Sequence, residues 1–253
     1  MRLERSTCLV TGASRGIGRA IATELVDRGA RVLAGTRPGS EDPPSPTTRV
    51  TMDLSSRESI ESSCDGLADE LGRVDLLVNN AGTYAGGQLE TQDVDSIYDL
   101  FQVNLVGLAH LTRRVLPGML ERRSGKLVNH SSIVGYMHFP GVTTYAASKA
   151  GVSAFTDSLR RELKGSGVTT MEIVTGGVNT DMLDRAAESF EGHSETSGWQ
   201  WMDPAEWARQ IVDGIEQDER TVGPPGRARV GKVLASGPAF LVDALADKGF
   251  ERS

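Results

Sequence analysis

Two side chains four residues apart, Tyr145 and Lys149, form a pair that can move a proton. Residues at this spacing lie on one face of a helix, and the stretch from Thr144 to Lys164 has a helical pattern. A tyrosine with its ordinary pKa of about 10 is a poor acid or base at neutral pH, and a neighbouring ammonium group favours the phenolate. The spacing therefore predicts that Tyr145 is a general acid/base assisted by Lys149.

Two further polar residues are candidates for the same site. Ser132 lies at the carboxyl end of a strand predicted to begin at Lys126, where open α/β sheets place their sites, and its hydroxyl can hydrogen-bond a substrate oxygen. Asn104 lies inside a long helical pattern, Asp93 to Glu121, although asparagine is a weak helix former. One explanation for Asn104 is a buried side chain bonded to neighbouring backbone; a functional role is the other.

A glycine-rich turn stands between the first apolar segment, Thr7 to Val10, and a helical pattern that runs from Gly16 to Arg28. Its sequence is Thr11-Gly12-Ala13-Ser14-Arg15-Gly16-Ile17-Gly18. Glycines let the backbone turn tightly and approach a pyrophosphate, and a helix N-terminus offers N–H groups and positive potential to phosphates. A glycine cluster also occurs in purely structural turns, but its place between strand and helix predicts a dinucleotide site.

The order of the remaining elements places these groups on one framework. Further strands are predicted at 31–36, 49–52, 74–78, from 126 and at 168–174, and helices at 55–71, 93–121, 144–164 and from Pro204. Four prolines within 37–46 exclude a regular helix there, so that connection is expected to be a loop. The alternation predicts an α/β fold: one domain over residues 1–253, with a Rossmann-like, doubly wound parallel sheet and helices on both faces.

Composition excludes several classes of protein. The 253 residues carry a net charge of -7, which argues against a nucleic-acid partner. No apolar run reaches the roughly 20 residues of a membrane span, and no signal peptide is visible, so a cytoplasmic enzyme is expected. Cys8 and Cys64 are expected to be reduced structural thiols. No metal is expected, because no ligand spacing joins the four histidines: His110, His130, His138 and His193.

These motifs together resemble the short-chain dehydrogenase/reductase family. The glycine turn has that family's Thr-Gly-x-x-x-Gly-x-Gly fingerprint, and the resemblance covers Thr7 to about Met182. Four further motifs match in the same order: Asp53-Leu54 after the third strand, Asn79-Asn80-Ala81-Gly82 after the fourth, Ser132 after the fifth and Tyr145-x-x-x-Lys149 in the next helix.

The resemblance implies an oxidoreductase that moves a hydride between a nicotinamide dinucleotide and a carbonyl or alcohol carbon. In that family pattern Tyr145 is the acid/base, Ser132 positions the substrate oxygen and Lys149 holds the nicotinamide ribose. Asn104, in a kinked helix, holds a water that leads to Lys149. The implied cofactor contacts are Gly12, Ser14, Arg15, Gly16, Ile17, Gly18, Arg37, Asp53, Leu54, Asn80, Ala81, Gly82, Tyr145, Lys149, Val178 and Thr180. Asp53 has an alternative role as a cap for the following helix.

The end of the second strand bears on the choice of dinucleotide. NAD-binding members of the family usually carry an acidic residue there, and this chain has Thr36, followed by Arg37. Basic residues at Arg37 and at Arg15 mark an NADP preference in the family. Charge-assisted hydrogen bonds contribute about 1.5–3 kcal/mol each, so these residues predict NADP(H). For one of the two arginines the alternative is a solvated surface charge.

Two residues depart from the family pattern. Thr175 replaces the usual proline in the segment Thr175-Gly176-Gly177-Val178-Asn179-Thr180, which loosens the backbone. His130 stands on the fifth strand where an aliphatic residue is usual, and a satisfied core histidine is favoured there over a catalytic one.

The candidate substrate residues lie near Ser132 and Tyr145 or in the polar segment 183–202. Tryptophans in that segment suggest a flap that closes over a bulky, partly apolar ketone or alcohol. Alternatively, they pack the segment against the body or a partner subunit. The candidates are Tyr84, Tyr136, Met137, His138, Phe139, Met182, Trp199 and Trp201.

The favoured function is NADPH-dependent reduction of a ketone. An NADP-dependent alcohol dehydrogenase working toward the ketone is one alternative, and a non-catalytic NADP(H) sensor that has kept the fold is another. The complete set of Asn104, Ser132, Tyr145 and Lys149 argues against a sensor, which needs no proton relay. By resemblance, a homodimer or homotetramer that pairs through the two long helices is expected.

Overall fold

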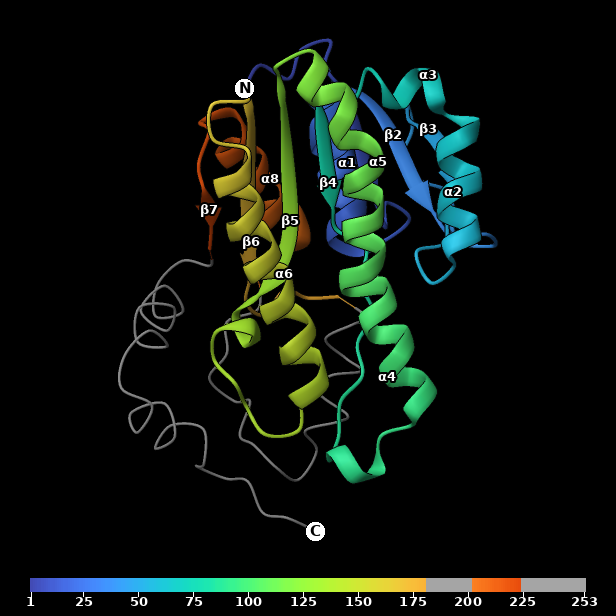
Figure 1. The fold of residues 1–253 in the computed structure, drawn as a ribbon, viewed down its shortest axis with the longest axis vertical. Coiled ribbons are helices and arrows are strands. Elements are labelled where there is room, and N and C mark those ends of the chain that lie inside the picture. Colours follow the sequence, from blue (N-terminus) through green and yellow to red (C-terminus); the bar gives the residue numbers. More distant parts are fainter. Residues whose placement is uncertain (181–201, 224–253) are drawn as a thin grey trace.

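A seven-stranded parallel sheet is the centre of the computed structural model, which describes residues 1–180 and 202–223 (Figure 1). The strand order is β3-β2-β1-β4-β5-β6-β7, and every neighbouring pair is parallel. The order reverses between β1 and β4, so the Rossmann-like, doubly wound sheet is confirmed. The strands are β1 (Thr7–Thr11), β2 (Arg31–Thr36), β3 (Thr48–Thr51), β4 (Leu76–Asn79), β5 (Gly125–Ser132), β6 (Val168–Thr175) and β7 (Thr221–Val222).

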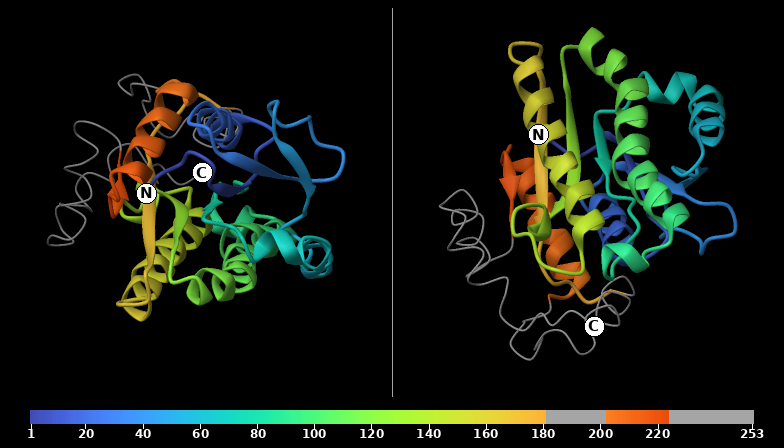
Figure 2. Two further views of the ribbon diagram at one scale, coloured as in Figure 1. Left: turned by 90° about the horizontal axis from the view of Figure 1, so that it is seen from above. Right: turned by 60° about the horizontal axis from the view of Figure 1, so that its bottom comes forward.

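Helices cover both faces of this sheet (Figure 2). On one face lie α1 (Gly16–Asp27) and α8 (Pro204–Glu216). On the other lie α2 (Arg57–Gly66), α3 (Ala68–Leu71), α5 (Gly107–Glu121) and α6 (Thr143–Glu162). The helix α4 (Val94–Phe101) precedes α5 in the chain.

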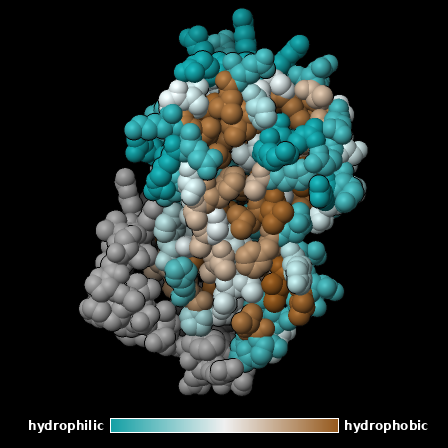
Figure 3. All heavy atoms as spheres, in the orientation of Figure 1, coloured by the Kyte–Doolittle hydropathy of each residue, from teal (hydrophilic) through white to brown (hydrophobic). Residues whose placement is uncertain are grey.

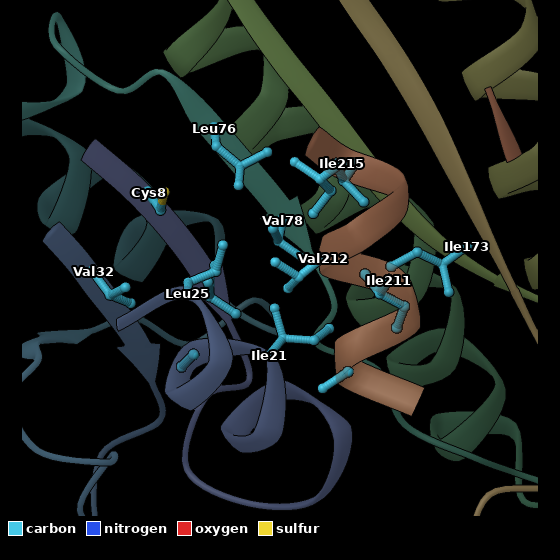
Figure 4. Packing of buried hydrophobic residues seen from close by; sticks show 14 of the residues in the cluster. Cys8, Ile21, Leu25, Val32, Leu76, Val78, Ile173, Ile211, Val212 and Ile215 are labelled. Carbon is cyan, nitrogen blue, oxygen red and sulfur yellow. The ribbon is translucent and has the colours of Figure 1, made fainter. Parts of the chain in front are cut away.

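Strand residues alternate between two hydrophobic cores, because successive side chains of a strand point to opposite faces. Leu9 and Leu77 pack with α2 and α5, whereas Val10 and Val78 pack with α1 and α8. Figure 4 shows the second of these cores between the sheet and the two helices, with the labelled side chains Cys8, Ile21, Leu25, Val32, Leu76, Val78, Ile173, Ile211, Val212 and Ile215.

The helix predicted over 93–121 is interrupted by a π-helical segment, Gln102–Val106, which joins α4 to α5. Asp93 caps its start by accepting a hydrogen bond from the Ser96 amide at 3.0 Å. Gly107 follows the π segment and lies so close to Leu54 that an added Cβ would stand 2.9 Å from the leucine Cβ. The predicted helix 55–71 is likewise divided at Leu67 into α2 and α3.

The connection from β2 to β3 has no helix, as its prolines predicted. Two arginines hold this loop through Asp42. Arg19 donates to the Asp42 carbonyl oxygen at 2.6 Å, and Arg49 forms an ion pair with the Asp42 carboxylate at 2.6 Å. The short strand β7 and the 3-10 turns Leu89–Thr91 and Ile133–Gly135 were not predicted.

Within residues 1–180 and 202–223, no helix combines the length and the apolar composition that a membrane crossing requires. The same residues contain no cluster of three or more histidine, cysteine or acidic side chains arranged to bind a metal ion.

Candidate active site

The four predicted catalytic residues come from three elements at the carboxyl end of the sheet. Ser132 is the last residue of β5, Tyr145 and Lys149 lie in the first two turns of α6, and Asn104 lies in the π segment. Ser132 lies near enough to the Tyr145 hydroxyl to lower its pKa. The Lys149 Nζ lies 5.8 Å from the centroid of the Tyr145 ring. The structure therefore brings the hydroxyl pair and the ammonium group to one place.

The side chain of Asn104 is buried and fully hydrogen-bonded. Its Oδ1 accepts from the Thr83 amide at 2.8 Å, and its Nδ2 donates to the Thr83 carbonyl oxygen at 3.0 Å and to Ser148 Oγ at 3.1 Å. An added Cβ on Gly82 would lie 3.2 Å from Asn104 Oδ1 and 3.5 Å from Lys149 Nζ. Asn104 thus holds the loop after β4 close to Lys149, and its part in a proton relay stays a prediction.

Burial sets the protonation of the two α6 residues. It lowers the pKa of the Lys149 ammonium group to about 8, and the Nζ donates to the His130 carbonyl oxygen at 3.0 Å. Burial also raises the pKa of Tyr145 to about 12, against the opposing effect of Ser132. The spacing predicted that Lys149 would lower the pKa of Tyr145. Burial raises that pKa instead, so Tyr145 holds its proton at neutral pH.

The glycine turn after β1 has the backbone that a phosphate site requires. Gly12 and Gly16 have φ values of +68° and +54°, in the left-handed region that favours glycine. An added Cβ on Gly18 would stand 2.2 Å from the Gly12 carbonyl oxygen. Only glycine therefore allows α1 to start this close to the end of β1. Ser14 and Ile17, between these glycines, are partly exposed.

The end of β2 carries a polar group, the Thr36 hydroxyl, that a ligand could bind. Thr36 is 2% exposed, and its Oγ1 has no hydrogen-bond partner among the described residues. A buried hydroxyl without a partner is costly, so a ligand oxygen at this position would satisfy it. Arg37 is exposed beside it. The residues present here fit a dinucleotide whose ribose carries a phosphate group.

Asp53 and Leu54 make contacts within the protein. The Asp53 carboxylate accepts from the Ser55 amide at 2.9 Å and from the Ser55 hydroxyl at 2.8 Å, so it caps the turn before α2. Ser56 is the N-cap of α2 itself. Leu54 is buried, and its carbonyl oxygen accepts from Gln102 Nε2 at 3.1 Å.

The loops after β4 and β6 are tied to the glycine turn. The Asn80 side-chain amide donates to the Thr11 carbonyl oxygen at 3.0 Å, and the Ala81 amide donates to Thr11 Oγ1 at 3.0 Å. Thr180 lies against Gly16, where an added Cβ would be 3.5 Å from the Thr180 methyl carbon. Val178 is buried and forms an isolated β-bridge with Met202.

Comparison with known proteins agrees with this geometry. The family model described as short chain dehydrogenase matches residues 6–190. This chain belongs to the short-chain dehydrogenase family. It is accordingly an oxidoreductase that acts on CH–OH or C=O groups.

Curated relatives and solved structures extend the match. A 3-oxoacyl-(acyl-carrier-protein) reductase of Vibrio harveyi is 41% identical over 188 residues, which cover 72% of this chain and 77% of the relative. The enzyme of that name from Thermotoga maritima is 34% identical over 203 residues, covering 74% and 80%. A short-chain dehydrogenase from Streptomyces avermitilis superposes with a TM-score of 0.79 at 27% identity, covering 96% and 97%.

In this short-chain dehydrogenase, the predicted substrate residues lie at different places. The Tyr84 ring meets the Tyr145 ring edge-on, with centroids 5.1 Å apart and planes at 63°. The Tyr136 hydroxyl lies 2.7 Å from both carboxylate oxygens of the buried Glu172. His138 is exposed, and Met137 and Phe139 are partly exposed. Met182, Trp199, Trp201 and the predicted flap, except Met202, lie outside the described residues.

Sequence reasoning missed part of the site's support. Ser148, the partner of Asn104, gave no signal beyond its place on α6. Trp207 of α8, which is 1% exposed, donates through Nε1 to Thr175 Oγ1 at 2.9 Å. His130 is the satisfied core histidine that was predicted, because both ring nitrogens are hydrogen-bonded. The two departures from the family pattern, His130 and Thr175, are partners of one another.

Proposed function

We propose that this protein reduces a ketone to an alcohol with NADPH. The observation that carries the proposal is the grouping of Tyr145, Ser132 and the buried Lys149 at the carboxyl end of the sheet, with the Lys149 Nζ 5.8 Å from the centroid of the Tyr145 ring. A phenol whose pKa is about 12 is a proton donor at neutral pH, and a donor is what a carbonyl oxygen needs as it becomes an alkoxide.

Each side chain of the site has its own role in the proposed reaction. NADPH, when bound, supplies the hydride. The Ser132 and Tyr145 hydroxyls bind the substrate carbonyl oxygen, which fixes its distance and polarises the bond. Tyr145 gives its proton to that oxygen as negative charge develops there. The buried Lys149, charged below a pKa of about 8, stabilises the tyrosinate that remains.

Three features support NADP(H) as the dinucleotide. Thr36 replaces a carboxylate that would repel a 2′-phosphate, and its unpartnered hydroxyl faces no competing protein group among the described residues. Arg37 and Arg15 provide exposed positive charge next to the ends of β2 and of the glycine turn. A metagenomic short-chain oxidoreductase with a TM-score of 0.70 and 28% identity, covering 89% of this chain and 100% of its own, was solved in complex with NADP.

The names of the curated relatives support the reductive direction and suggest a first substrate to try. They are 3-oxoacyl-(acyl-carrier-protein) reductases, whose name describes reduction of the ketone at carbon 3 of an acyl chain. We infer that the ketone is bulky and partly apolar, because the Tyr84 ring packs edge-on against the Tyr145 ring. A panel of 3-oxoacyl thioesters and aryl or cyclic ketones covers this class.

The test is a binding titration of NADPH and NADH, followed by measurement of NADPH consumption with the ketone panel. Tight NADPH binding with turnover of a ketone supports the proposal. Turnover only of an alcohol with NADP⁺ would favour the oxidative alternative. Tight NADPH binding without turnover of the panel in either direction would contradict the proposed substrate class and leave the sensor as the alternative.

We also propose that the protein pairs through the helices that carry the site. Large apolar side chains are exposed on this part of the chain, with Val94 62%, Tyr98 74% and Val106 49% exposed. In the orientation of Figure 1, apolar surface runs along the face made by α5 and α6 (Figure 3). Sedimentation of the wild type and of Tyr98→Arg tests this: a dimer or tetramer that dissociates in the variant is expected, and a monomeric wild type would contradict it.

A further inference from the structure

A chain of hydrogen bonds between side chains crosses the carboxyl ends of the central strands. Trp207 Nε1 of α8 lies 2.9 Å from Thr175 Oγ1 of β6, which lies 2.5 Å from His130 Nε2 of β5. The other ring nitrogen, His130 Nδ1, lies 2.9 Å from Asn80 Oδ1 in the loop after β4. The Asn80 Nδ2 then donates to the Thr11 carbonyl oxygen of β1 at 3.0 Å.

Hydrogen-bond chemistry gives this chain one direction. An indole N–H can only donate, so Thr175 Oγ1 accepts from Trp207 and its own hydrogen points to His130 Nε2. The amide group of Asn80 already donates to Thr11, so its Oδ1 faces the histidine and can only accept. His130 Nδ1 therefore carries the imidazole hydrogen, and every donor in the chain meets an acceptor.

The chain lies in the interior, where an unpaired polar group is costly. Trp207 is 1% exposed, Thr175 8% and His130 9%. Each single substitution in the family's usual direction, aliphatic at 130 or proline at 175, would leave a buried partner without its hydrogen bond. The two unusual residues therefore require one another.

The backbone of the same two residues contacts the catalytic side chains. The His130 carbonyl oxygen accepts from Lys149 Nζ at 3.0 Å, and the Thr175 carbonyl oxygen accepts from Ser132 Oγ at 3.4 Å. The side-chain bond between His130 and Thr175 thus fixes the two strand ends whose carbonyl groups hold Lys149 and Ser132.

We propose that His130 and Thr175 are a pair of positioning residues for carbonyl reduction. They are not catalytic residues, because they act through Lys149 and Ser132. In this protein the hydrogen bond between their side chains supplies the rigidity that proline supplies at position 175 in the usual family pattern. The expected effect on kcat rests on the proposed function. The expected tautomer of His130 rests only on the hydrogen-bond chain.

The kinetic test uses Thr175→Val, which removes the hydroxyl and keeps the shape. Its matched control is Thr170→Val on the same strand: Thr170 is 4% exposed, and its Oγ1 has no partner among the described residues. We expect Thr175→Val to lower kcat by about tenfold or more, because small misplacements of reacting groups have large effects on rate. The dissociation constant for NADPH should change by less than about threefold, since the bond from His130 to Asn80 remains.

Thr175→Ser keeps the hydroxyl and is expected to retain kcat within about threefold of the wild type, as is Thr170→Val. A kcat for folded Thr175→Val equal to that of Thr170→Val would overturn the proposal. So would a loss in Thr175→Ser as large as that in Thr175→Val, because the hydroxyl would then not be the important group.

A second measurement does not depend on the enzymatic activity of any variant. Nitrogen-15 NMR of the histidine rings, with the His130 signals assigned by their loss in His130→Val, reports which nitrogen carries hydrogen. Neutral His130 with hydrogen on Nδ1 is expected at neutral pH. Hydrogen on Nε2, or on both nitrogens, would refute the chain. A wild type without NADPH turnover would contradict the proposed function alone, and the tautomer would still decide the structural inference.

Discussion

Mild acid should destabilise this protein through His130. Burial, with a smaller contribution from Lys149, lowers the pKa of the folded-state imidazole to about 3, whereas an unfolded histidine has a pKa of about 6.5. Below about pH 6.5 the unfolded chain gains a proton that the folded protein does not accept. The free energy of unfolding therefore falls as the pH falls, and it continues to fall until the folded-state pKa is reached.

The size of this loss follows from the same two values. Each pH unit between them is equivalent to about 1.36 kcal/mol, so at about pH 5 the contribution of His130 is a loss of about 2 kcal/mol. For a chain of 253 residues this corresponds to a fall in Tm of roughly 4–8 °C. Between about pH 5 and 7.5 the carboxylates are largely ionised in both states, which leaves the histidines as the main contributors.

The assay is urea unfolding followed by tryptophan fluorescence at several values across that range. His130→Val is expected to be less stable than the wild type at every pH, because the Asn80 Oδ1 loses its donor and the Thr175 hydroxyl loses its acceptor. Over this pH range its free energy of unfolding should nevertheless change by about 2 kcal/mol less than that of the wild type. Equal slopes for the two proteins would show that folded His130 accepts a proton, and the reasoning would be refuted.

The other predictions concern the dinucleotide. Thr36→Asp places a carboxylate at the end of β2 and should weaken NADPH binding about tenfold or more, equivalent to about 1.4 kcal/mol, while the affinity for NADH stays the same or rises. Titration with both cofactors checks this prediction. An unchanged NADPH affinity would contradict the assignment of NADP(H). Gly18→Ala would place its Cβ 2.2 Å from the Gly12 carbonyl oxygen, so NADPH binding should be lost and stability should fall by about 1–3 kcal/mol. Gly66→Ala, with nothing within 4 Å of the added Cβ, is the control and should bind NADPH normally; equal binding by the two alanine variants would disprove a close approach at Gly18.

The features that local sequence patterns determine were predicted correctly. Short apolar segments alternating with helical periodicity indicated the parallel sheet, and the prolines between Arg37 and Thr47 indicated the loop between β2 and β3. The glycines of the first turn indicated where backbone approaches backbone, and the close contact between Gly18 and Gly12 agrees. Asp203 before Pro204 indicated the start of α8, and its carboxylate accepts from the amides of the first turn.

Features that depend on tertiary contacts were not predictable. The resemblance implied a kinked helix at Asn104, but not the contacts of its side chain with Thr83 and Ser148, which are distant in sequence. The raised pKa of Tyr145 depends on burial, which spacing to Lys149 does not report. His130 and Thr175 each looked like an isolated departure, because only the pairing of β5 with β6 brings them together.

The central claim, carbonyl reduction with Tyr145 as proton donor, is tested most directly by following deuterium. NADPH that carries deuterium at both C4 positions of the nicotinamide is supplied with the ketone that the wild type turns over, and product formation is compared with that of Tyr145→Phe. We predict that the wild type places deuterium on the carbinol carbon, and that Tyr145→Phe binds NADPH normally but reacts about 10²–10⁴-fold more slowly. Unchanged turnover by Tyr145→Phe, or an alcohol without deuterium, would contradict the account.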